Sequence, residues 1–359
     1  MNNRNVPVKK GHADLDTPER IRDFHRKLAT GWEEEYQEYR QLWADLPKSR
    51  KVRDYPLLVD LELASICNLN CPMCPRAMSH YRTVVDEGCM DVALAKRIIT
   101  EIAGKVFALR LSLVGESTLH PNFLEVLRFA KEKGIREVSF LTNGSTLDLE
   151  FFRKVVEAGA DWITISVDGI DNEYEAIRRP LKFSEILGKL QAIKRFKDEH
   201  HLIKPVLRVQ GVWPAIRPNP ARYYELLAPL ADLVSYSPLI DYLKKDTLDE
   251  VVYEEEFSCP QIFQRIVICS DGRSKLCSAD EERSFIVGDA NVETIHQIWH
   301  GKPLTDVRTA HGIEDGFKSI TACAWCYYPR KTEDNEQAKV GERTIRIENY
   351  INRKQIIGK

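Results

Sequence analysis

The stretch that decides the fold is LLVDLELASICNLNCPMC, residues 57–74, in which an apolar run ends and a short loop with three cysteines follows. The apolar run has the aliphatic content of a buried β-strand. Cys67, Cys71 and Cys74 come directly after it, so the loop that carries them lies at the carboxyl end of that strand. Thiols clustered in this way predict a metal or redox site rather than core packing.

Five more short aliphatic runs follow the first, and amphipathic stretches separate them. The strand candidates are residues 57–66, 108–115, 137–144, 161–169, 206–213 and 232–239. The intervening stretches, such as DVALAKRIITEIAGK, repeat apolar residues at i, i+3, i+4 and i+7, which is typical of helices with one buried face. Six βα units in a row predict an α/β fold with a parallel sheet, either doubly wound or a full or partial barrel.

Polar residues end several of these strands, and in parallel α/β sheets ligands bind at the carboxyl ends. The strand-end residues that should face the cysteine loop are Gly115, Glu116, Ser117, Asn143, Ser166 and Asp168. A tight turn explains Asn143, in the sequence TNG, as well as a substrate contact does.

The overall charge argues against polyanionic partners. Lys and Arg together number 52 against 54 Asp and Glu, so no bulk field would attract nucleic acid or an anionic membrane. The first thirty residues contain no apolar signal segment, and no charge-poor apolar run reaches the roughly 18 residues of a membrane span. We therefore expect a soluble, cytoplasmic protein. Nine clustered cysteines in such a chain indicate metal or redox chemistry rather than disulfides.

The pattern divides the chain of 359 residues into four parts. Residues 1–55 predict a helical extension that begins at Thr17-Pro18, an N-cap followed by a first-turn proline, and packs an aromatic face on the barrel exterior. Residues 56–245 form the βα core. Residues 250–330 predict a small second domain with a β-hairpin that turns at Asp271-Gly272 and a helix over ETIHQIWHGKPLTDVRTAH. Residues 331–359 form a polar tail without a recognisable pattern.

The loop of Cys67, Cys71 and Cys74 supplies three of the four thiolates of a closed [4Fe-4S] cluster, so one iron is left for another ligand. The alternative is structural zinc, which takes four protein ligands. The stretch CNLNCPMC contains no fourth cysteine or histidine, which disfavours zinc.

In this position after a first strand, CNLNCPMC resembles the signature of the radical S-adenosylmethionine (SAM) enzymes, whose core is a partial (β/α)6 barrel. The resemblance implies that the open iron binds the amino and carboxylate groups of S-adenosylmethionine. Reductive cleavage then gives methionine and a 5′-deoxyadenosyl radical that abstracts hydrogen from the substrate. A flavodoxin- or ferredoxin-type electron donor is implied as well.

The strand ends fit the same family. Gly115, Glu116 and Ser117 match its glycine-and-glutamate motif, which binds the methionine amino group. Ser166 and Asp168 stand where family members contact the ribose. Arg178, in YEAIRRP, matches the arginine that binds the methionine carboxylate; Arg179 and an ordinary surface arginine are the alternatives.

A second cysteine group resembles the start of the SPASM domain, which carries auxiliary iron-sulfur clusters. Its members are Cys259, Cys277, Cys323 and Cys326. The SPASM pattern continues with two more cysteines, but CAWCYYPRKTEDNEQ contains none, which leaves the shorter form called twitch. These four thiolates would ligate all four irons of a second [4Fe-4S] cluster. Such a cluster can stabilise the fold or transfer electrons, but it has no iron free to bind a substrate.

Two cysteines remain. Cys89 is interpreted as a packing residue. A two-residue turn would pair Cys269 with Ser274 and place Cys269 and Cys277 on opposite hairpin faces, although a bulge would reverse this. That favours a core thiol at Cys269 over a cluster ligand, with a role as hydrogen-atom donor left open.

The short auxiliary domain is most similar to the 2-deoxy-scyllo-inosamine dehydrogenase type of radical SAM enzyme. This implies oxidation of a carbon that bears a hydroxyl group in a small carbohydrate-like molecule: a sugar, cyclitol or nucleotide sugar. The auxiliary cluster would accept an electron. The alternatives are a peptide-modifying maturase, a sugar epimerase or deoxygenase, and a non-catalytic iron-sulfur carrier.

Overall fold

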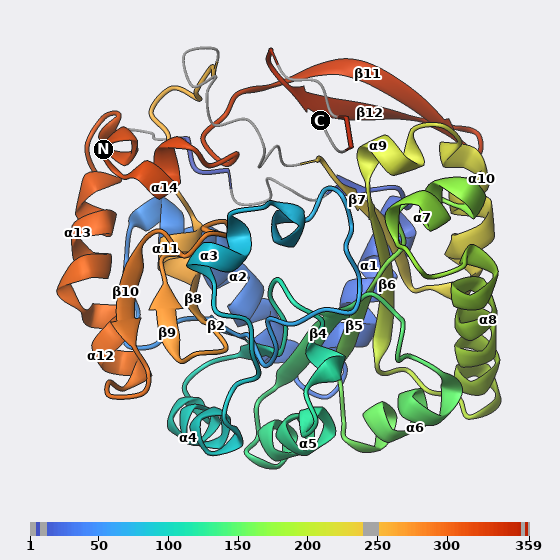
Figure 1. Ribbon diagram of the computed structural model, residues 1–359, viewed down its shortest axis with the longest axis horizontal. Helices are drawn as coiled ribbons and strands as arrows, with labels where there is room; N and C mark the ends of the chain where they lie inside the picture. Colours follow the sequence, from blue (N-terminus) through green and yellow to red (C-terminus); the bar gives the residue numbers. More distant parts are fainter. Residues whose placement is uncertain (1–4, 8–12, 240–250, 353–355, 358–359) are drawn as a thin grey trace.

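A curved, largely parallel sheet forms the centre of the computed structural model, which describes residues 5–7, 13–239, 251–352 and 356–357 (Figure 1). Its strands run in the order β1-β7-β6-β5-β4-β3-β2-β8-β9-β10. The six central strands are β2 (Leu58–Leu61), β3 (Ala108–Arg110), β4 (Glu137–Thr142), β5 (Trp162–Ser166), β6 (Val206–Val212) and β7 (Leu233–Ser237). They are parallel and lie in sequence order, so the expected (β/α)6 arrangement is confirmed.

Helices surround the outside of this sheet (Figure 1). They are α4 (Val92–Ile102), α5 (Phe123–Glu132), α6 (Leu149–Glu157), α8 (Phe183–Glu199) and α10 (Pro220–Leu227). Asp91 and Asp148 cap α4 and α6 by accepting the N–H groups of Leu94 and Phe151. Short helices α3 (Tyr81–Val84), α7 (Asp171–Ile177) and α9 (Trp213–Ile216) follow the carboxyl ends of strands β2, β5 and β6.

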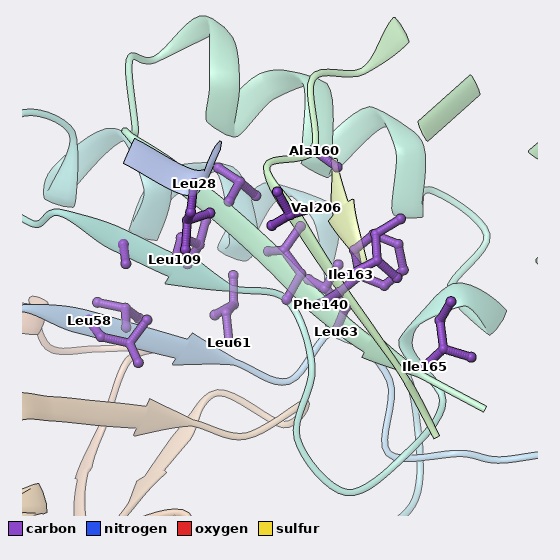
Figure 2. Close-up of a cluster of buried hydrophobic side chains, with 14 of the residues drawn as sticks. Leu28, Leu58, Leu61, Leu63, Leu109, Phe140, Ala160, Ile163, Ile165 and Val206 are labelled. Carbon is purple, nitrogen blue, oxygen red and sulfur yellow. The ribbon is translucent and has the colours of Figure 1, made fainter. Parts of the chain in front are cut away.

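The sheet remains open at its edges. β1 (Ala13–Asp14) pairs antiparallel with β7, and β8 (Arg265–Ile268) pairs parallel with β2. Within the described residues no pairing joins β1 to β10, so the barrel is partial. Figure 2 shows part of the hydrophobic core, in which Leu28 lies with strand residues such as Leu58, Leu109 and Phe140.

The N-terminal extension consists of two helices, α1 (Pro18–Ala29) and α2 (Glu33–Ser49), rather than one. Thr17 caps α1 as expected, and its hydroxyl accepts the Arg20 N–H at 3.3 Å. The helices separate at Gly31, whose φ of 87° a helix does not tolerate. Their aromatic residues pack beneath the strands' N-terminal ends rather than on the outer ring of helices. The Phe24 ring contacts Trp162 at the start of β5.

The second cysteine region continues the same sheet through β8, β9 (Arg273–Lys275) and β10 (Ile286–Asp289). Its short helices are α11 (Gln261–Gln264), α12 (Ile295–His300), α13 (Lys302–Ala310) and α14 (Thr321–Ala324). The single helix expected over residues 293–311 is therefore two. Pro303 lies in the first turn of α13, where it has no N–H to donate to the end of α12. The expected boundary between residues 245 and 250 lies outside the described residues.

The hairpin register differs from the expected one. Ile268 is opposite Ser274, and Cys269 donates its N–H to the Arg273 carbonyl, so three residues form the turn. Gly272 takes the left-handed position with φ 88°. This one-residue shift removes the parity argument that placed Cys269 and Cys277 on opposite faces.

The C-terminal region is not a structureless tail. β11 (Thr332–Val340) and β12 (Arg343–Tyr350) form a hairpin that packs near α10. Glu336 anchors it, because its carboxylate accepts from the Trp213 indole at 3.0 Å and the Arg217 guanidinium at 2.9 Å. The alternation of apolar and polar residues in RTIRIENY is the sequence pattern that could have predicted β12.

Among the described helices, none has the length and apolar content needed to cross a membrane.

Candidate active site

The three-cysteine loop opens into a cavity of about 250 Å³ at the carboxyl ends of the parallel strands. The expected site residues that line it are Cys67, Cys71, Cys74, Gly115, Glu116, Ser166 and Arg178. Asn143 lines it too. Val212 and Ser237, the last residues of β6 and β7, line it as well, so the fold gathers residues from the ends of all six parallel strands around one space.

Hydrogen bonds hold the cysteine loop. The Cys74 N–H donates to the Cys71 carbonyl at 3.0 Å, and the Asn143 side chain donates to Asn68 at 2.9 Å. The buried Arg76 guanidinium, which the sequence analysis did not select, donates to the Leu69 carbonyl at 3.3 Å. Burial raises the pKa of the Cys74 thiol to about 12. A positively charged group such as iron is therefore needed to hold a thiolate here.

Gly115 has no room for a side chain. A Cβ at this position would lie 2.2 Å from the Ala64 carbonyl oxygen and 2.7 Å from that of Ile66, in the segment that leads into the cysteine loop. The next residue, Glu116, donates its N–H to the Ile66 carbonyl at 2.8 Å. Glycine is therefore required so that the end of β3 can approach this backbone.

The Glu116 carboxylate joins two strand ends. It accepts from the Thr118 hydroxyl at 2.6 Å, the Thr142 hydroxyl at 2.9 Å and the Asn143 N–H at 2.6 Å. Burial raises its pKa, and these hydrogen bonds oppose the shift. Ser117, the third residue of the expected motif, is fully buried and does not line the cavity.

Arg178 lines the cavity, whereas Arg179 is exposed, so the structure favours the first of the two candidate arginines. The Asp168 carboxylate accepts from the Arg178 Nε at 2.6 Å and, through its other oxygen, from the Val212 N–H at 2.8 Å. Asp168 is 1% exposed and does not line the cavity. In the structure Asp168 contacts Arg178, and Ser166 is the residue at this strand end that lines the cavity. The expected contact of Asp168 with a ribose stays a prediction.

The second group of cysteines also converges. Burial raises the pKa of Cys259 to about 12 and that of Cys277 to about 11. For Cys323 and Cys326 the pKa is raised by burial first and then by the charges of the other thiols in the group, which shows their proximity. The four thiols match the donor set of one closed [4Fe-4S] cluster.

His311 supports this group and was missed in the sequence. Its Nδ1 accepts the Cys259 N–H at 3.3 Å, so the proton of the neutral imidazole is on Nε2. Nε2 lies 3.5 Å from the Cys323 Sγ and can donate to it. His311 lies near the end of an amphipathic helix, twelve residues before Cys323, and this spacing matches no recognisable ligand motif.

The two remaining cysteines lie outside both groups. Cys269 is buried, and the charged residues around it are Glu62, Lys275, Arg283 and Asp271 rather than the cluster cysteines. Cys89 is exposed, although its backbone forms a bridge with Ala64, so its interpretation as a packing residue is wrong.

Buried charged residues connect the two cysteine sites. The Lys275 side chain is 1% exposed, and its Nζ lies 3.9 Å from the Glu281 carboxylate. The charge of Glu281 in turn helps to raise the pKa of the Cys74 thiol. His80, just after the first cysteine loop, contacts Glu282 at 2.8 Å. The segment after Cys277 therefore packs directly against the first site.

Comparison with known families agrees with this geometry. A radical SAM superfamily model matches residues 61–204, and a model of the SPASM iron-sulfur cluster-binding domain matches residues 259–327. The chain therefore contains a radical SAM domain and a SPASM domain. These domains imply a [4Fe-4S] cluster with S-adenosylmethionine and an auxiliary iron-sulfur cluster, so the expected cofactors are confirmed, while the assignment of individual cysteines as ligands stays a prediction.

The chain is 28% identical over 261 residues to the tungsten-containing aldehyde ferredoxin oxidoreductase cofactor-modifying protein of Pyrococcus furiosus, covering 67% of this chain and 71% of that protein. It is also 30% identical over 142 residues to the AdoMet-dependent heme synthase of Methanosarcina barkeri. That match covers 39% of this chain and only 40% of the synthase.

Solved structures share the fold at low sequence identity. BtrN in complex with AdoMet and 2-DOIA is 17% identical with a TM-score of 0.52, covering 77% of this chain and 94% of BtrN. Native anSMEcpe with bound AdoMet is 14% identical with a TM-score of 0.55, covering 75% and 87%. At these identities the similarity shows a common fold.

Proposed function

We propose that this radical SAM enzyme is an oxidoreductase that removes hydrogen from a hydroxyl-bearing carbon of a small polar molecule such as a sugar, cyclitol or nucleotide sugar. The observation that carries the proposal is the four-thiol auxiliary site, where Cys259, Cys277, Cys323 and Cys326 leave no iron free to bind a substrate. A fully ligated cluster close to the first site suits electron transfer, which a dehydrogenation requires.

The bound groups would supply hydrogen abstraction at the first site and an electron acceptor at the second. The chain's own residues position the ligands: Arg178 suits the carboxylate of S-adenosylmethionine, and Ser166 suits a hydroxyl group. Leu69, Met73 and Val212 line the same cavity and exclude water from the reacting carbon. A reduced flavodoxin- or ferredoxin-type protein would deliver the starting electron.

The fold is shared with BtrN, whose structure contains 2-DOIA, and a small-molecule substrate is compatible with that fold. A second candidate is the modification of a cofactor, because similarity to the Pyrococcus furiosus cofactor-modifying protein extends over most of that protein. The two candidates differ in substrate and share the cluster chemistry.

Anaerobic turnover separates these possibilities. Reconstituted enzyme is incubated with S-adenosylmethionine and dithionite, together with small carbohydrates, pterin-type cofactors or peptides, and 5′-deoxyadenosine is followed by mass spectrometry. We expect stimulation by the carbohydrates and a product two mass units lighter, which is the loss of two hydrogens. Stimulation by the cofactors or peptides alone would contradict the proposal. A product of unchanged mass in H₂O that becomes one mass unit heavier in D₂O would indicate epimerisation and a donor such as Cys269.

A cysteine pair provides the matched test of the auxiliary site. Replacing Cys323 and Cys326 by Ala should lower the iron content from about eight to about four and stop dehydrogenation, while some cleavage of S-adenosylmethionine continues. The control is Cys89→Ala, an exposed cysteine outside both groups, which should keep all the iron. Normal product formation by the double variant would exclude the electron-acceptor role.

A further inference from the structure

A second cavity lies at the opposite end of the barrel from the cysteine loop. It has a volume of about 230 Å³ and is covered by α1 and α2. Five of the strand residues at its wall are the first residues of their strands: Leu58, Glu137, Trp162, Leu233 and Arg265. The cavity therefore belongs to the N-terminal ends of the strands, and the radical SAM chemistry does not use it.

Positive charge predominates in this lower cavity. Its lining contains four arginines against two carboxylates: Arg40, Arg110, Arg208 and Arg265 with Asp14 and Glu137. Asp60 compensates two of the arginines, at 3.1 Å from Arg265 and 3.6 Å from Arg110. In the described part of the chain, Arg208 forms no ion pair or hydrogen bond, and its only close partner is the Trp162 ring at 4.7 Å.

The polar atoms left without partners in the lining are all donors. The Nε of Arg208, the Nε of Arg265 and the indole Nε1 of Trp162 are buried, and none reaches an acceptor among the described residues. An unsatisfied buried donor is unfavourable, and more so when it is charged. Water could accept these hydrogen bonds but would not neutralise the Arg208 guanidinium.

The surroundings work against the charge on Arg208. Burial, followed by the neighbouring Arg110, lowers the pKa of Arg208 to about 9. The negative charges of Asp14 and then Glu137 oppose this shift without cancelling it. Glu137 gives little compensation, because burial and the charge of Asp161 raise its pKa to about 7, so a large share of it is protonated at neutral pH. An unpaired buried charge of this kind is unfavourable unless an opposite charge joins it.

We propose that this lower cavity binds a compact oxyanion, a phosphate or carboxylate group, with Arg208 as its charged ligand and Arg265 and Trp162 as further donors. Guanidinium groups are well suited to such anions because they donate several hydrogen bonds in one plane. The Trp162 ring lies 4.7 Å from the Arg208 guanidinium carbon and also contacts Phe24 of α1, so a bound anion would stabilise the N-terminal helices over the barrel as well.

The test uses inorganic phosphate and succinate as probes on the reconstituted full-length enzyme in a buffer free of other oxyanions. Binding is measured by isothermal titration calorimetry, and the midpoint of thermal unfolding is followed at the same concentrations. We expect one site per chain for at least one probe and a midpoint that rises with its concentration. Phosphate and succinate distinguish the two kinds of oxyanion.

Three variants make the result specific. Arg208→Met should weaken binding at least tenfold, Arg208→Lys should weaken it less, and the exposed Arg128→Met on α5 should leave it unchanged. Saturable binding that survives in Arg208→Met would overturn the proposal. The absence of saturable binding of both probes to the wild type would equally overturn it and leave a cavity filled by water. Turnover of the enzyme is not needed for either readout, so the outcome is independent of the proposed dehydrogenation.

Discussion

The Asp168 carboxylate holds the Arg178 guanidinium through a single oxygen, with Nε at 2.6 Å and Nη2 at 2.5 Å. The side chains are 2% and 14% exposed, so the pair is largely removed from water. Asp168 therefore sets where Arg178 points in the cavity beside the first cysteine loop without facing that cavity itself. A carboxylate that positions a binding arginine should affect binding almost as strongly as the arginine does.

Replacing Asp168 by Asn tests this relationship. The change leaves the buried guanidinium without its counter-charge, and such losses cost about 3–5 kcal/mol of folding stability. We expect a loss near 3 kcal/mol in chemical denaturation and at least tenfold weaker binding of S-adenosylmethionine in equilibrium dialysis. The control Asp171→Asn, which affects an exposed pair with Arg222, should change neither. Wild-type affinity in Asp168→Asn would show that Arg178 is positioned by other contacts.

Gly115→Ala should prevent assembly of the first cluster. The new methyl group would lie 2.2 Å from the Ala64 carbonyl oxygen, so the backbone leading to Cys67 must move. We expect about four irons per chain instead of eight, because the auxiliary site is untouched. Gly188→Ala is the control: that glycine lies in α8 with open space around it, and alanine there should add about 0.5–1 kcal/mol of stability. A full iron content in Gly115→Ala would contradict the packing argument.

His311→Leu should make the auxiliary cluster harder to reduce. The His311 Nε2 can donate to the Cys323 Sγ at 3.5 Å, and such hydrogen bonds stabilise the extra negative charge of a reduced cluster. Potentiometric titration followed by electron paramagnetic resonance should show a more negative reduction potential, with the iron content retained. The exposed His300→Leu should leave the potential unchanged. A potential that stays at the wild-type value in His311→Leu would assign this histidine to packing alone.

Glu137 gives a pH dependence with a defined sign. Burial, assisted by the charge of Asp161, raises its pKa from an ordinary 4.5 to about 7 in the folded protein. The fold therefore favours the protonated carboxyl, so this contribution to stability is present below about pH 4.5 and is lost as the pH rises through 7.

Glu137→Gln removes this pH-dependent loss of stability, because glutamine stays neutral at every pH. The variant should become more stable than the wild type as the pH rises, by up to about 3 kcal/mol above neutral pH. Urea denaturation at acidic, neutral and mildly basic pH, in oxyanion-free buffer, measures the difference. An exposed control, Glu150→Gln, should show no such trend. A constant difference between the variant and the wild type at all pH values would mean that Glu137 does not titrate in this range.

Local patterns predicted the regular part of the fold. All six parallel strands lie within the ranges expected from their aliphatic runs, because such runs can be satisfied only by a sheet buried on both faces. The first helix begins at Pro18 after its Thr17 cap, since capping depends on adjacent residues. Helix ends were less predictable: the breaks at Gly31 and before Pro303 occur inside continuous apolar periodicity.

The hairpin of β11 and β12 was missed because its polar residues form their hydrogen bonds and ion pairs with residues that are distant in the sequence. Glu336 is anchored by Trp213 and Arg217, more than a hundred positions earlier. The register at Cys269 was predicted one residue out, since a three-residue turn and a two-residue turn fit the same SDGR sequence.

The sequence by itself determined the parallel core, the two cysteine groups and the class of cofactor, because strand periodicity and ligand spacing are properties of short segments. The tertiary structure alone decided that Asp168 faces Arg178, that His311 supports Cys323, and that unpartnered donors of Arg208, Arg265 and Trp162 share one cavity. These relationships depend on which buried groups meet after strands and helices pack. Burial makes each of them energetically important, and burial is a property of the whole fold.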